Sequence, residues 1–436
     1  MGHVLASTPI VLCLVLIVGL ARRHFSTNER HWLWACLLLH IATAISHVYI
    51  VRNLYGTGDM DTYHRLGVMF AAMLRDSPVE VSWLLVQELF QHRTPLFPPE
   101  LVGGATGSMF AISTFVAFLA NDSLVAASIL VGGFAFLGKL ATYRTFRSEL
   151  APEHRPAALF GCLFIPSVAF WSSGLLKETI AVGGLGLAVF GGYALATRHR
   201  SWLGLSLFIG GTTAVALVKA YLLMPFGIAA GLWLFFDGHR APPRRRQRSL
   251  RVGGAVVGVA VVLSAFVGIG HLFPRFDVTS LASELAHQQR LVEQTRGGSD
   301  YAFDEAGDGT LRGHASQVPF ALATALFRPT LLEASNPQIV LNAAETFVTT
   351  LLLLWVLLAV GPHRCLRRLR EQPLLVFSLA MALGIALGVG MATTNLGSLS
   401  RYRAPMMPFY VVPLLVLARG VNRRSGARAH ELSWRS

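Results

Sequence analysis

Long apolar runs follow one another along the whole chain, with short polar segments between them. A run of about 17 to 25 apolar residues can cross the hydrocarbon core of a bilayer as a helix, and the pattern predicts about eleven such spans, within a range of about 10 to 12. The predicted spans are Val4–Leu20, Trp32–Ile50, Ser123–Thr142, Ala157–Trp171, Thr179–Ala196, Trp202–Val218, Tyr221–Phe236, Val252–Leu272, Ile339–Gly361, Pro373–Met391 and Pro405–Leu417. The sequence therefore predicts an all-α polytopic membrane protein with a single integral membrane domain over residues 1–436.

Composition agrees with this prediction, because 53% of the residues are hydrophobic and only 14% are charged. The net charge of +14 raises the question of nucleic-acid binding. However, the basic residues gather in short segments that flank the predicted spans, as the positive-inside rule expects of cytoplasmic loops. These segments are Arg22–Arg30, Arg144–Arg155, Arg198–Arg200, Arg240–Arg251, His363–Arg370 and Arg419–Arg435. We therefore interpret the basic segments as cytoplasmic flanks of the spans, with specific binding of anionic lipids as the alternative. We expect membrane lipids and no nucleic acid among the partners of the protein.

The same rule predicts the orientation of the chain. With every basic segment inside, the amino terminus lies outside, and both the basic loop 237–251 and the tail 420–436 lie in the cytoplasm. Two large loops, 51–106 and 273–338, then lie outside. The apolar segment within 107–122 is short and would invert all later loops if it crossed the membrane, so we expect a re-entrant or interfacial helix there.

One predicted hairpin interrupts the apolar pattern with charged residues. The stretch IPSVAFWSSGLLKET, Ile165–Thr179, places Lys177 and Glu178 between two apolar arms. The predicted orientation puts it at the outer face, where serine and glycine suit a turn and Lys177 can extend to water. A membrane-surface hairpin with an anchoring lysine is one interpretation, and a wall of a functional site is the other.

The first outer loop begins with GTGDMDTYHRLG, Gly56–Gly67, an acidic and aromatic segment close to the membrane. Asp59 or Asp61 could act as a general base on a sugar hydroxyl, or the two could hold a divalent cation, Mg²⁺ or Mn²⁺, against a phosphate. Tyr63 and His64 follow at once and are candidate substrate-binding residues. A solvated, turn-rich loop is the alternative interpretation.

Cationic residues are predicted at three more places on the outer face. Arg328 and Glu333 precede the ninth span, Lys219 lies in a turn between the sixth and seventh spans, and Arg401, Tyr402 and Arg403 lie between the tenth and eleventh. Outside arginines depart from the positive-inside rule, and they suit either a phosphate of a lipid-linked substrate or phospholipid headgroups. We expect these cations to converge with Asp59, Asp61, Glu178 and Glu333 at one outward site, with Glu178 as a further catalytic candidate.

The segments GDMDTY, PSVAFWSSGLLKE, LFRPTLLEASNP and SRYRAPMMP, in this order, resemble the GT-C superfamily of polytopic glycosyltransferases, in a bacterial group of the dolichyl- or polyprenyl-phosphate-sugar-dependent type. The resemblance implies transfer of a sugar from a polyprenyl phosphate or diphosphate to a glycan or glycolipid acceptor at the outer face of the bacterial cytoplasmic membrane. It also implies cell-surface polysaccharide assembly, with other assembly proteins as partners. The sequence departs from many relatives because its acidic loop follows the second span and not the first.

Three other functions fit parts of the pattern. A Wzy-type polymerase or ligase would join lipid-linked repeat units at the same face and would also use outside arginines. A transporter of lipid-linked sugars would place ionisable residues within its spans, as His40, His47 and Glu345 are placed. A non-catalytic assembly subunit is the fourth possibility.

Overall fold

Helices make up nearly all of the chain that the structure describes. The computed structural model describes residues 2–56, 58–90, 92, 94–96, 104–197, 202–238, 311–393 and 395–419, and this part contains no β-strand. The predicted span Val252–Leu272, the tail 420–436, and most of the loops 237–251 and 273–338 lie outside the described residues. Among the described residues, the prediction of an all-α protein is confirmed.

The helices group into two compact units, and the chain passes between them after Thr145, Ser167 and Ala220. Unit 1 comprises residues 1–145 and 168–220, and unit 2 comprises 146–167 and 221–436. Three helical segments continue from one unit into the other: α6 (Leu124–Glu149), α8 (Pro166–Trp171) and Trp202–Asp237.

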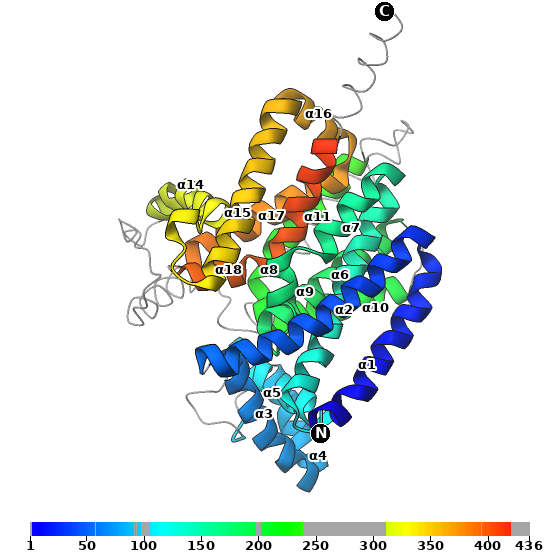
Figure 1. The fold of residues 1–436 in the computed structure, drawn as a ribbon, viewed down its shortest axis with the longest axis vertical. Coiled ribbons are helices and arrows are strands. Elements are labelled where there is room, and N and C mark those ends of the chain that lie inside the picture. Colours follow the sequence, from blue (N-terminus) through cyan, green and yellow to red (C-terminus); the bar gives the residue numbers. More distant parts are fainter. Residues whose placement is uncertain are drawn as a thin grey trace, which may run out of the picture. The chain divides into compact units, whose positions relative to one another are not determined.

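Unit 1 holds the amino-terminal helices and the pair α9 and α10, labelled in Figure 1. Its helices are α1 (Gly2–Ala21), η1 (Arg22–His24), α2 (Thr27–Ile50), η2 (Val51–Tyr55), α3 (Asp59–Asp76), α4 (Pro78–Leu89), α5 (Gly104–Leu119), most of α6, α9 (Lys177–Thr197) and α10 (Trp202–Lys219). Glycines let three of them approach closely, and α6, α9 and α10 lie side by side in Figure 1. A Cβ atom on Gly186 would lie 2.0 Å from the carbonyl oxygen of Gly138, and one on Gly211 would lie 2.5 Å from that of Gly184. The glycine-rich run of α9 therefore serves close helix packing, as small residues do in membrane helices.

Unit 2 is built around α17 (Pro373–Ala392). Its other helices are η3 (Pro152–His154), α7 (Arg155–Leu163), α11 (Leu223–Gly238), α14 (Leu311–Phe327), η6 (Leu331–Glu333), α15 (Pro337–Trp355), η7 (Val356–Val360), α16 (Pro362–Glu371), α18 (Leu396–Tyr402), η8 (Ala404–Met406) and residues 407–419. Close approach again depends on glycine: Gly384 faces Pro225 of α11, and Gly390 faces the carbonyl of Ala321 in α14. A residue with a larger side chain at either position would push the helices apart.

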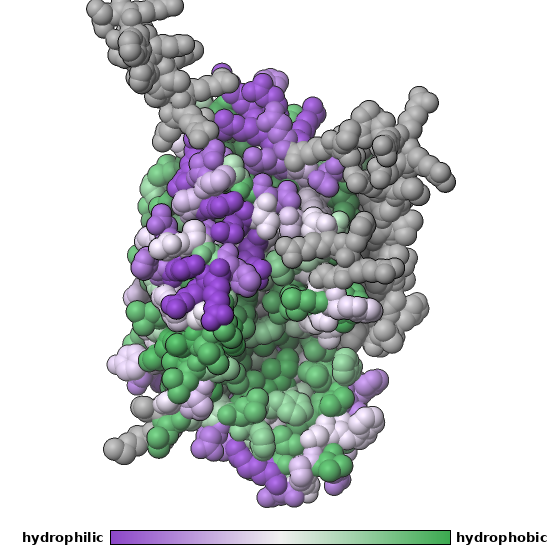
Figure 2. Space-filling view, turned by 90° about the vertical axis from the view of Figure 1, so that its right-hand side faces the viewer, coloured by the Kyte–Doolittle hydropathy of each residue, from purple (hydrophilic) through white to green (hydrophobic). Residues whose placement is uncertain are grey.

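Seven helices in the described part of the chain are long and apolar enough to cross a membrane. They are Leu5–His24, Thr27–Leu54, Leu124–Glu149, Lys177–Thr197, Trp202–Asp237, Pro337–Val360 and Pro373–Ala392. Each coincides with one or two of the predicted spans. Many large hydrophobic side chains are exposed, and Figure 2 shows them in broad areas of the surface, as a lipid environment requires.

Three predicted spans differ in form from the expectation. Ala157–Trp171 is broken into α7 and α8, because Pro166 disfavours a helical conformation at Ile165 and is itself well suited to begin a helix. The predicted spans Trp202–Val218 and Tyr221–Phe236 form one helical segment of 36 residues. Only a 3₁₀ turn, η4 (Ala220–Leu222), marks the place where an outer turn was predicted.

The short apolar segment predicted as re-entrant or interfacial is helix α5. It is 16 residues long and packs against α3 so closely that a Cβ atom on Gly67 would lie 2.7 Å from the carbonyl oxygen of Ser113. The loop predicted before it is also helical, forming α3 and α4. Helix α5 is thus a packed part of unit 1 that is too short for an ordinary span.

Candidate functional site

Lys177 and Tyr63, which are 114 positions apart in sequence, meet in unit 1. The ammonium group of Lys177, the first residue of α9, donates a hydrogen bond of 2.9 Å to Thr106 Oγ1 near the start of α5. The same ammonium lies 5.9 Å from the centre of the Tyr63 ring, within the range of a cation–π interaction. Residues from α3, α5 and α9 therefore surround one half-buried cation.

Asp59 lies on α3, one helical turn before Tyr63. Asp59 and Tyr63 are four residues apart in α3 and so share one face of that helix. Asp59 is exposed, whereas Asp61 is half-buried and forms an ion pair of 2.9 Å with Arg65. Both carboxylates lie in the first turn of α3, where the helix dipole favours negative charge whether or not they have a chemical role.

Met60, at the start of α3, packs against the connection between α8 and α9. A Cβ atom on Gly174 would lie 3.0 Å from Met60 Sδ and 3.0 Å from His47 Nδ1, so the three residues are closely packed at this point of the connection. His47 stacks on Phe170 with ring centroids 4.2 Å apart, and its Nδ1 lies 3.2 Å from the Phe170 carbonyl oxygen. The acidic segment and the WSSGLLKE segment, which were predicted to converge, are therefore packed together in unit 1.

The connection itself is buried, which differs from the surface hairpin that the sequence predicts. Ser172, Ser173 and Leu175 are all 0% exposed. The serine hydroxyls are satisfied locally, because Ser172 Oγ donates to the Val168 carbonyl at 2.5 Å and Ser173 Oγ to the Phe170 carbonyl at 2.7 Å. Turn residues with their own hydrogen-bond partners can thus lie in the interior.

Glu178 and Lys219 are partners of each other. Lys219 Nζ lies 2.8 Å from Glu178 Oε1, and the two side chains are 6% and 1% exposed. The distance and the burial make this a close ion pair in the interior of unit 1. The pair ties the end of α10 to the start of α9, so both residues have a structural function in addition to any chemical one.

The side chain of His64 is buried and contacts the backbone, so it is poorly placed to bind a phosphate. Its Nε2 lies 3.0 Å from the carbonyl oxygen of Asp122, so this nitrogen carries the hydrogen and donates it. Burial lowers the pKa of His64, which keeps the imidazole neutral at pH 7. Asp122 also accepts two hydrogen bonds of 2.9 Å from Arg75, so α3 fixes the left-handed turn between α5 and α6 from two positions.

In unit 2, Arg328 and Glu333 form an ion pair across a short turn. Glu333 also accepts hydrogen bonds from Thr330 N and Thr330 Oγ1, at 2.7 and 3.0 Å. Burial alone would raise the pKa of Glu333, but the hydrogen bonds from Arg328 and Thr330 outweigh it and the pKa is lowered. The ion pair and the hydrogen bonds of the Glu333 carboxylate therefore stabilise the turn before α15.

Arg403 is 1% exposed and its guanidinium is engaged within unit 2. It donates to the Arg328 carbonyl at 2.8 Å, to Thr346 Oγ1 at 2.6 Å and to the Asn342 carbonyl at 3.4 Å. Such contacts fix the end of α18 against α15 and the turn after α14. Arg401 and Tyr402 are half-buried and lie together, with the guanidinium 5.7 Å from the ring centre, so they remain the more accessible part of this segment.

Glu345 of α15 binds the start of α8, next to the break between α7 and α8. Its carboxylate accepts hydrogen bonds from Ser167 N at 2.9 Å and from Ser167 Oγ at 2.5 Å. Ser167 is the second residue of α8, so a side chain from another helix satisfies one of the backbone donors that a helix start leaves open. The ionisable residue within the predicted ninth span thus has a defined structural partner.

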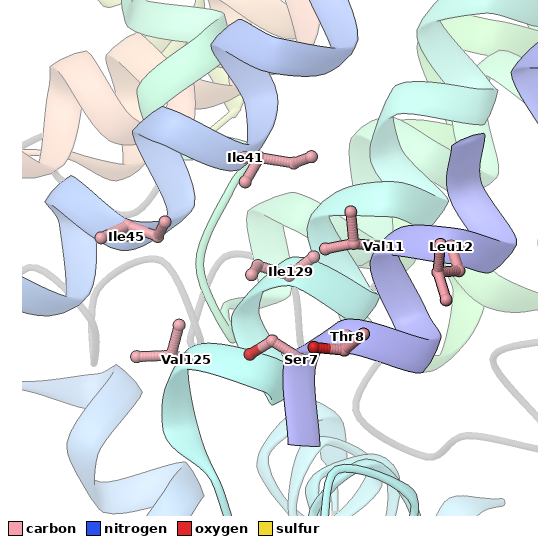
Figure 3. A pocket seen from close by; sticks show the side chains of 8 residues that line it. All are labelled: Ser7, Thr8, Val11, Leu12, Ile41, Ile45, Val125 and Ile129. Atoms are coloured by element: carbon pink, nitrogen blue, oxygen red, sulfur yellow. The ribbon is translucent and has the colours of Figure 1, made fainter. Parts of the chain in front are cut away.

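An open apolar groove of about 450 Å³ lies elsewhere in unit 1. Figure 3 shows its lining, which comes from α1, α2 and α6: Ser7, Thr8, Val11, Leu12, Ile41, Ile45, Val125 and Ile129. Two hydroxyl groups are its only polar side chains, so it suits hydrocarbon and lacks the groups for chemistry. Among the described residues, no cluster of three or more His, Cys, Asp or Glu side chains could hold a metal ion.

Several residues of these clusters carry no signal in the sequence. Thr106 and Met60 are ordinary residues of helices until the fold brings them beside Lys177 and Gly174. Glu88 is a further case: it is 0% exposed and holds Thr94 by hydrogen bonds of 2.9 and 2.8 Å. The prediction that the candidate residues of the two units join in one outward cavity stays a prediction.

Comparisons with protein-family models, with curated proteins and with solved structures found no match to this chain.

Proposed function

We propose that this protein is a membrane glycosyltransferase that uses a sugar linked to a polyprenyl phosphate or diphosphate. The observation that carries the proposal is the contact of Lys177 with Tyr63 in unit 1, one helical turn from Asp59 and next to the ends of helices long enough to cross a membrane. A carboxylate, an aromatic ring and a cation at a membrane boundary fit a sugar whose leaving group is a lipid phosphate. The resemblance of the sequence segments to the GT-C superfamily supports the same function.

Asp59 is the better candidate for the general base, because it shares a helix face with Tyr63, whose ring lies beside Lys177. Asp59 would take the proton from an acceptor hydroxyl while the acceptor oxygen forms a bond to the anomeric carbon. The bond from that carbon to the phosphate oxygen breaks, and its electron pair stays on the phosphate. Lys177 would stabilise the negative charge that develops there, which is worth most in a site that excludes water.

A divalent cation is compatible with this arrangement. Magnesium is commonly held by one or two carboxylates together with substrate phosphates and water, and Asp59 could be one such carboxylate. Asp61 lies two residues further along α3 and so points to another side of the helix, where it is paired with Arg65. The cation, Mg²⁺ or Mn²⁺, would neutralise charge on the donor phosphate, while Tyr63 and Lys177 orient the donor.

A Wzy-type polymerase would use the same chemistry on longer lipid-linked chains, and Arg401 and Tyr402 are suited to either substrate. A transporter is the second candidate from another class. Its support is a pair of basic residues within two of the apolar helices: Lys139 Nζ of α6 lies 3.2 Å from His40 Nδ1 of α2, and both are nearly fully buried. Ionisable residues within membrane helices often mark transport paths.

The proposal places the protein in the bacterial cytoplasmic membrane, in cell-surface polysaccharide or glycolipid assembly. Its test is deletion of the gene, followed by profiling of surface glycans and lipid-linked intermediates by mass spectrometry. A truncated glycan supports the transferase, accumulation of single complete repeat units supports the polymerase, and an unchanged profile contradicts both. Complementation with Asp59→Ala, Asp61→Ala and Arg401→Ala then tests the site, and full rescue by all three variants would overturn its assignment.

A further inference from the structure

Helix α16 is tied to the membrane at both of its ends. The apolar helix Pro337–Val360 ends one residue before α16, and the apolar helix Pro373–Ala392 begins one residue after it. A helix of ten residues is about 15 Å long. Tethers of one residue leave it no room to move away, so α16 must lie at the surface of the bilayer.

The inner side of α16 is fixed to unit 2. Cys365 is buried, and together with Leu369 it packs against Val356, Val360 and Leu417. Arg368 donates a hydrogen bond of 2.9 Å to the Leu417 carbonyl and so caps the last described turn of the chain. These contacts determine which side of the helix faces outward.

The outer side of α16 carries three exposed arginines, Arg364, Arg367 and Arg370. Arg367 lies 3.9 Å from Glu371, a loose pair in which both side chains are 64% exposed. Arg364 and Arg370 form no ion pair with any acidic residue in the described part of unit 2. Such a cationic side at a bilayer surface is complementary to phosphate groups of anionic lipids.

Leu366 distinguishes one edge of this outer side from the other. It is 49% exposed although it lies among arginines. At about 100° per residue, Arg370 lies about 40° from Leu366 around the helix, whereas Arg364 lies about 160° away. If Leu366 is inserted among acyl chains, Arg370 is held at the level of the headgroups and Arg364 points toward water.

We propose that α16 is an interfacial helix whose Leu366–Arg370 edge binds the phosphate of an anionic phospholipid. Leu366 anchors the edge in the hydrocarbon boundary, and the Arg370 guanidinium donates to the headgroup phosphate, with Arg367 beside it. Arg368 of the same helix binds the Leu417 carbonyl, which belongs to the helical residues 407–419. A lipid that holds α16 in place would therefore also stabilise this contact. This function is independent of any sugar transfer.

Native mass spectrometry of the purified full chain in detergent tests the proposal, with phosphatidylglycerol and phosphatidylcholine as probes. Arg370→Gln should weaken binding of phosphatidylglycerol about fivefold, as expected for one arginine near a lipid surface. Arg364→Gln removes the same charge from the same helix and should change this binding by less than about twofold. Equal effects of the two substitutions, or no effect of either, would overturn the proposal, as would equal binding of the two lipids.

Spin labels test the insertion of Leu366 separately. Leu366→Cys and Arg364→Cys are made in a chain whose four native cysteines are replaced by serine, and are labelled in vesicles of phosphatidylcholine and phosphatidylglycerol. The label at 366 should be relaxed mainly by oxygen, which concentrates in the bilayer, and the label at 364 mainly by a water-soluble nickel chelate. A label at 366 that is as accessible to nickel as the label at 364 would contradict the insertion of this edge.

Discussion

The ammonium group of Lys177 is bonded to the hydroxyl of Thr106, and this contact joins the start of α9 to the start of α5. The same ammonium lies 5.9 Å from the centre of the Tyr63 ring, so Lys177 also connects α9 to α3. Lys177 is half-buried, whereas Lys219 is 6% exposed and paired with Glu178.

Replacement of Lys177 should impair sugar transfer more than stability. Lys177→Met removes the positive charge beside the departing phosphate, and we expect a loss of about 10²–10³-fold in turnover, as for other electrostatic groups in active sites. Thr106→Val is the matched control, because it removes the hydrogen bond but leaves the charge. Turnover by Lys177→Met within about tenfold of the wild type would refute the assigned role.

The Glu178–Lys219 pair should behave as a structural pair in a double-mutant cycle. Glu178→Gln or Lys219→Met alone leaves a buried charge without its partner, and each should lower the free energy of unfolding by about 3–5 kcal/mol. The double variant should recover most of that loss, because no buried charge remains. Thermal melts of the four proteins in detergent measure the cycle, and additive losses in the double variant would show that the two residues do not act as a pair.

Arg401 and Arg403 should separate into a functional and a structural residue. Arg403→Gln leaves Thr346 and the carbonyl groups of Arg328 and Asn342 short of donors in a buried place, and should destabilise the fold by about 1–3 kcal/mol. Arg401→Gln should leave the melting temperature nearly unchanged and reduce transfer. The reverse assignment of effects in paired melting and activity measurements would contradict this division.

The Arg328–Glu333 turn predicts a specific dependence of stability on pH. Hydrogen bonds from Arg328 and Thr330 lower the pKa of Glu333 in the folded chain despite burial, so its contribution to stability is present above the unfolded value of about 4.3. That contribution is lost as the pH falls through the lowered folded pKa. The difference in melting temperature between wild type and Glu333→Gln should therefore be largest near neutral pH and vanish in acid.

Glu80→Gln is the control for this pH series, because Glu80 is exposed on α4. Its melting curves should follow those of the wild type at every pH. A Glu333→Gln difference that persists unchanged in acid would mean that the stability does not come from the ionised carboxylate.

Much of the helical framework was predictable, because membrane spans are recorded as continuous apolar runs. A glycine-rich run is typical of closely packed membrane helices, and Gly186 of α9 does lie close to Gly138 of α6. The break at Pro166 was missed although proline signals it, since the apolar pattern continues through the break and α15 supplies Glu345 to cover it. The proline favours a break in the helix at this point, whereas the length of the apolar run favours a continuous helix. The structure has the break.

The candidate site was less predictable, because partners far apart in sequence decide what a charged residue does. Lys219 and Arg403 are like Lys177 and Arg401 in type and predicted location, yet the fold pairs or buries the first two. Only three-dimensional neighbours such as Glu178 and Thr346 distinguish them. The packing of Met60 against Gly174 likewise depends on the shape of the connection and leaves no mark in the sequence.

Sugar transfer by the purified chain tests the central claim most directly. The full-length protein is reconstituted in vesicles with lipid-linked sugars extracted from cells that lack its gene, and release of free polyprenyl phosphate or diphosphate is measured by mass spectrometry. We predict release by the wild type, a loss of about 10²–10⁴-fold for Asp59→Asn, and a smaller loss for Asp61→Asn. Release by Asp59→Asn at the wild-type rate, or no release by the wild type from any extract, would contradict the account.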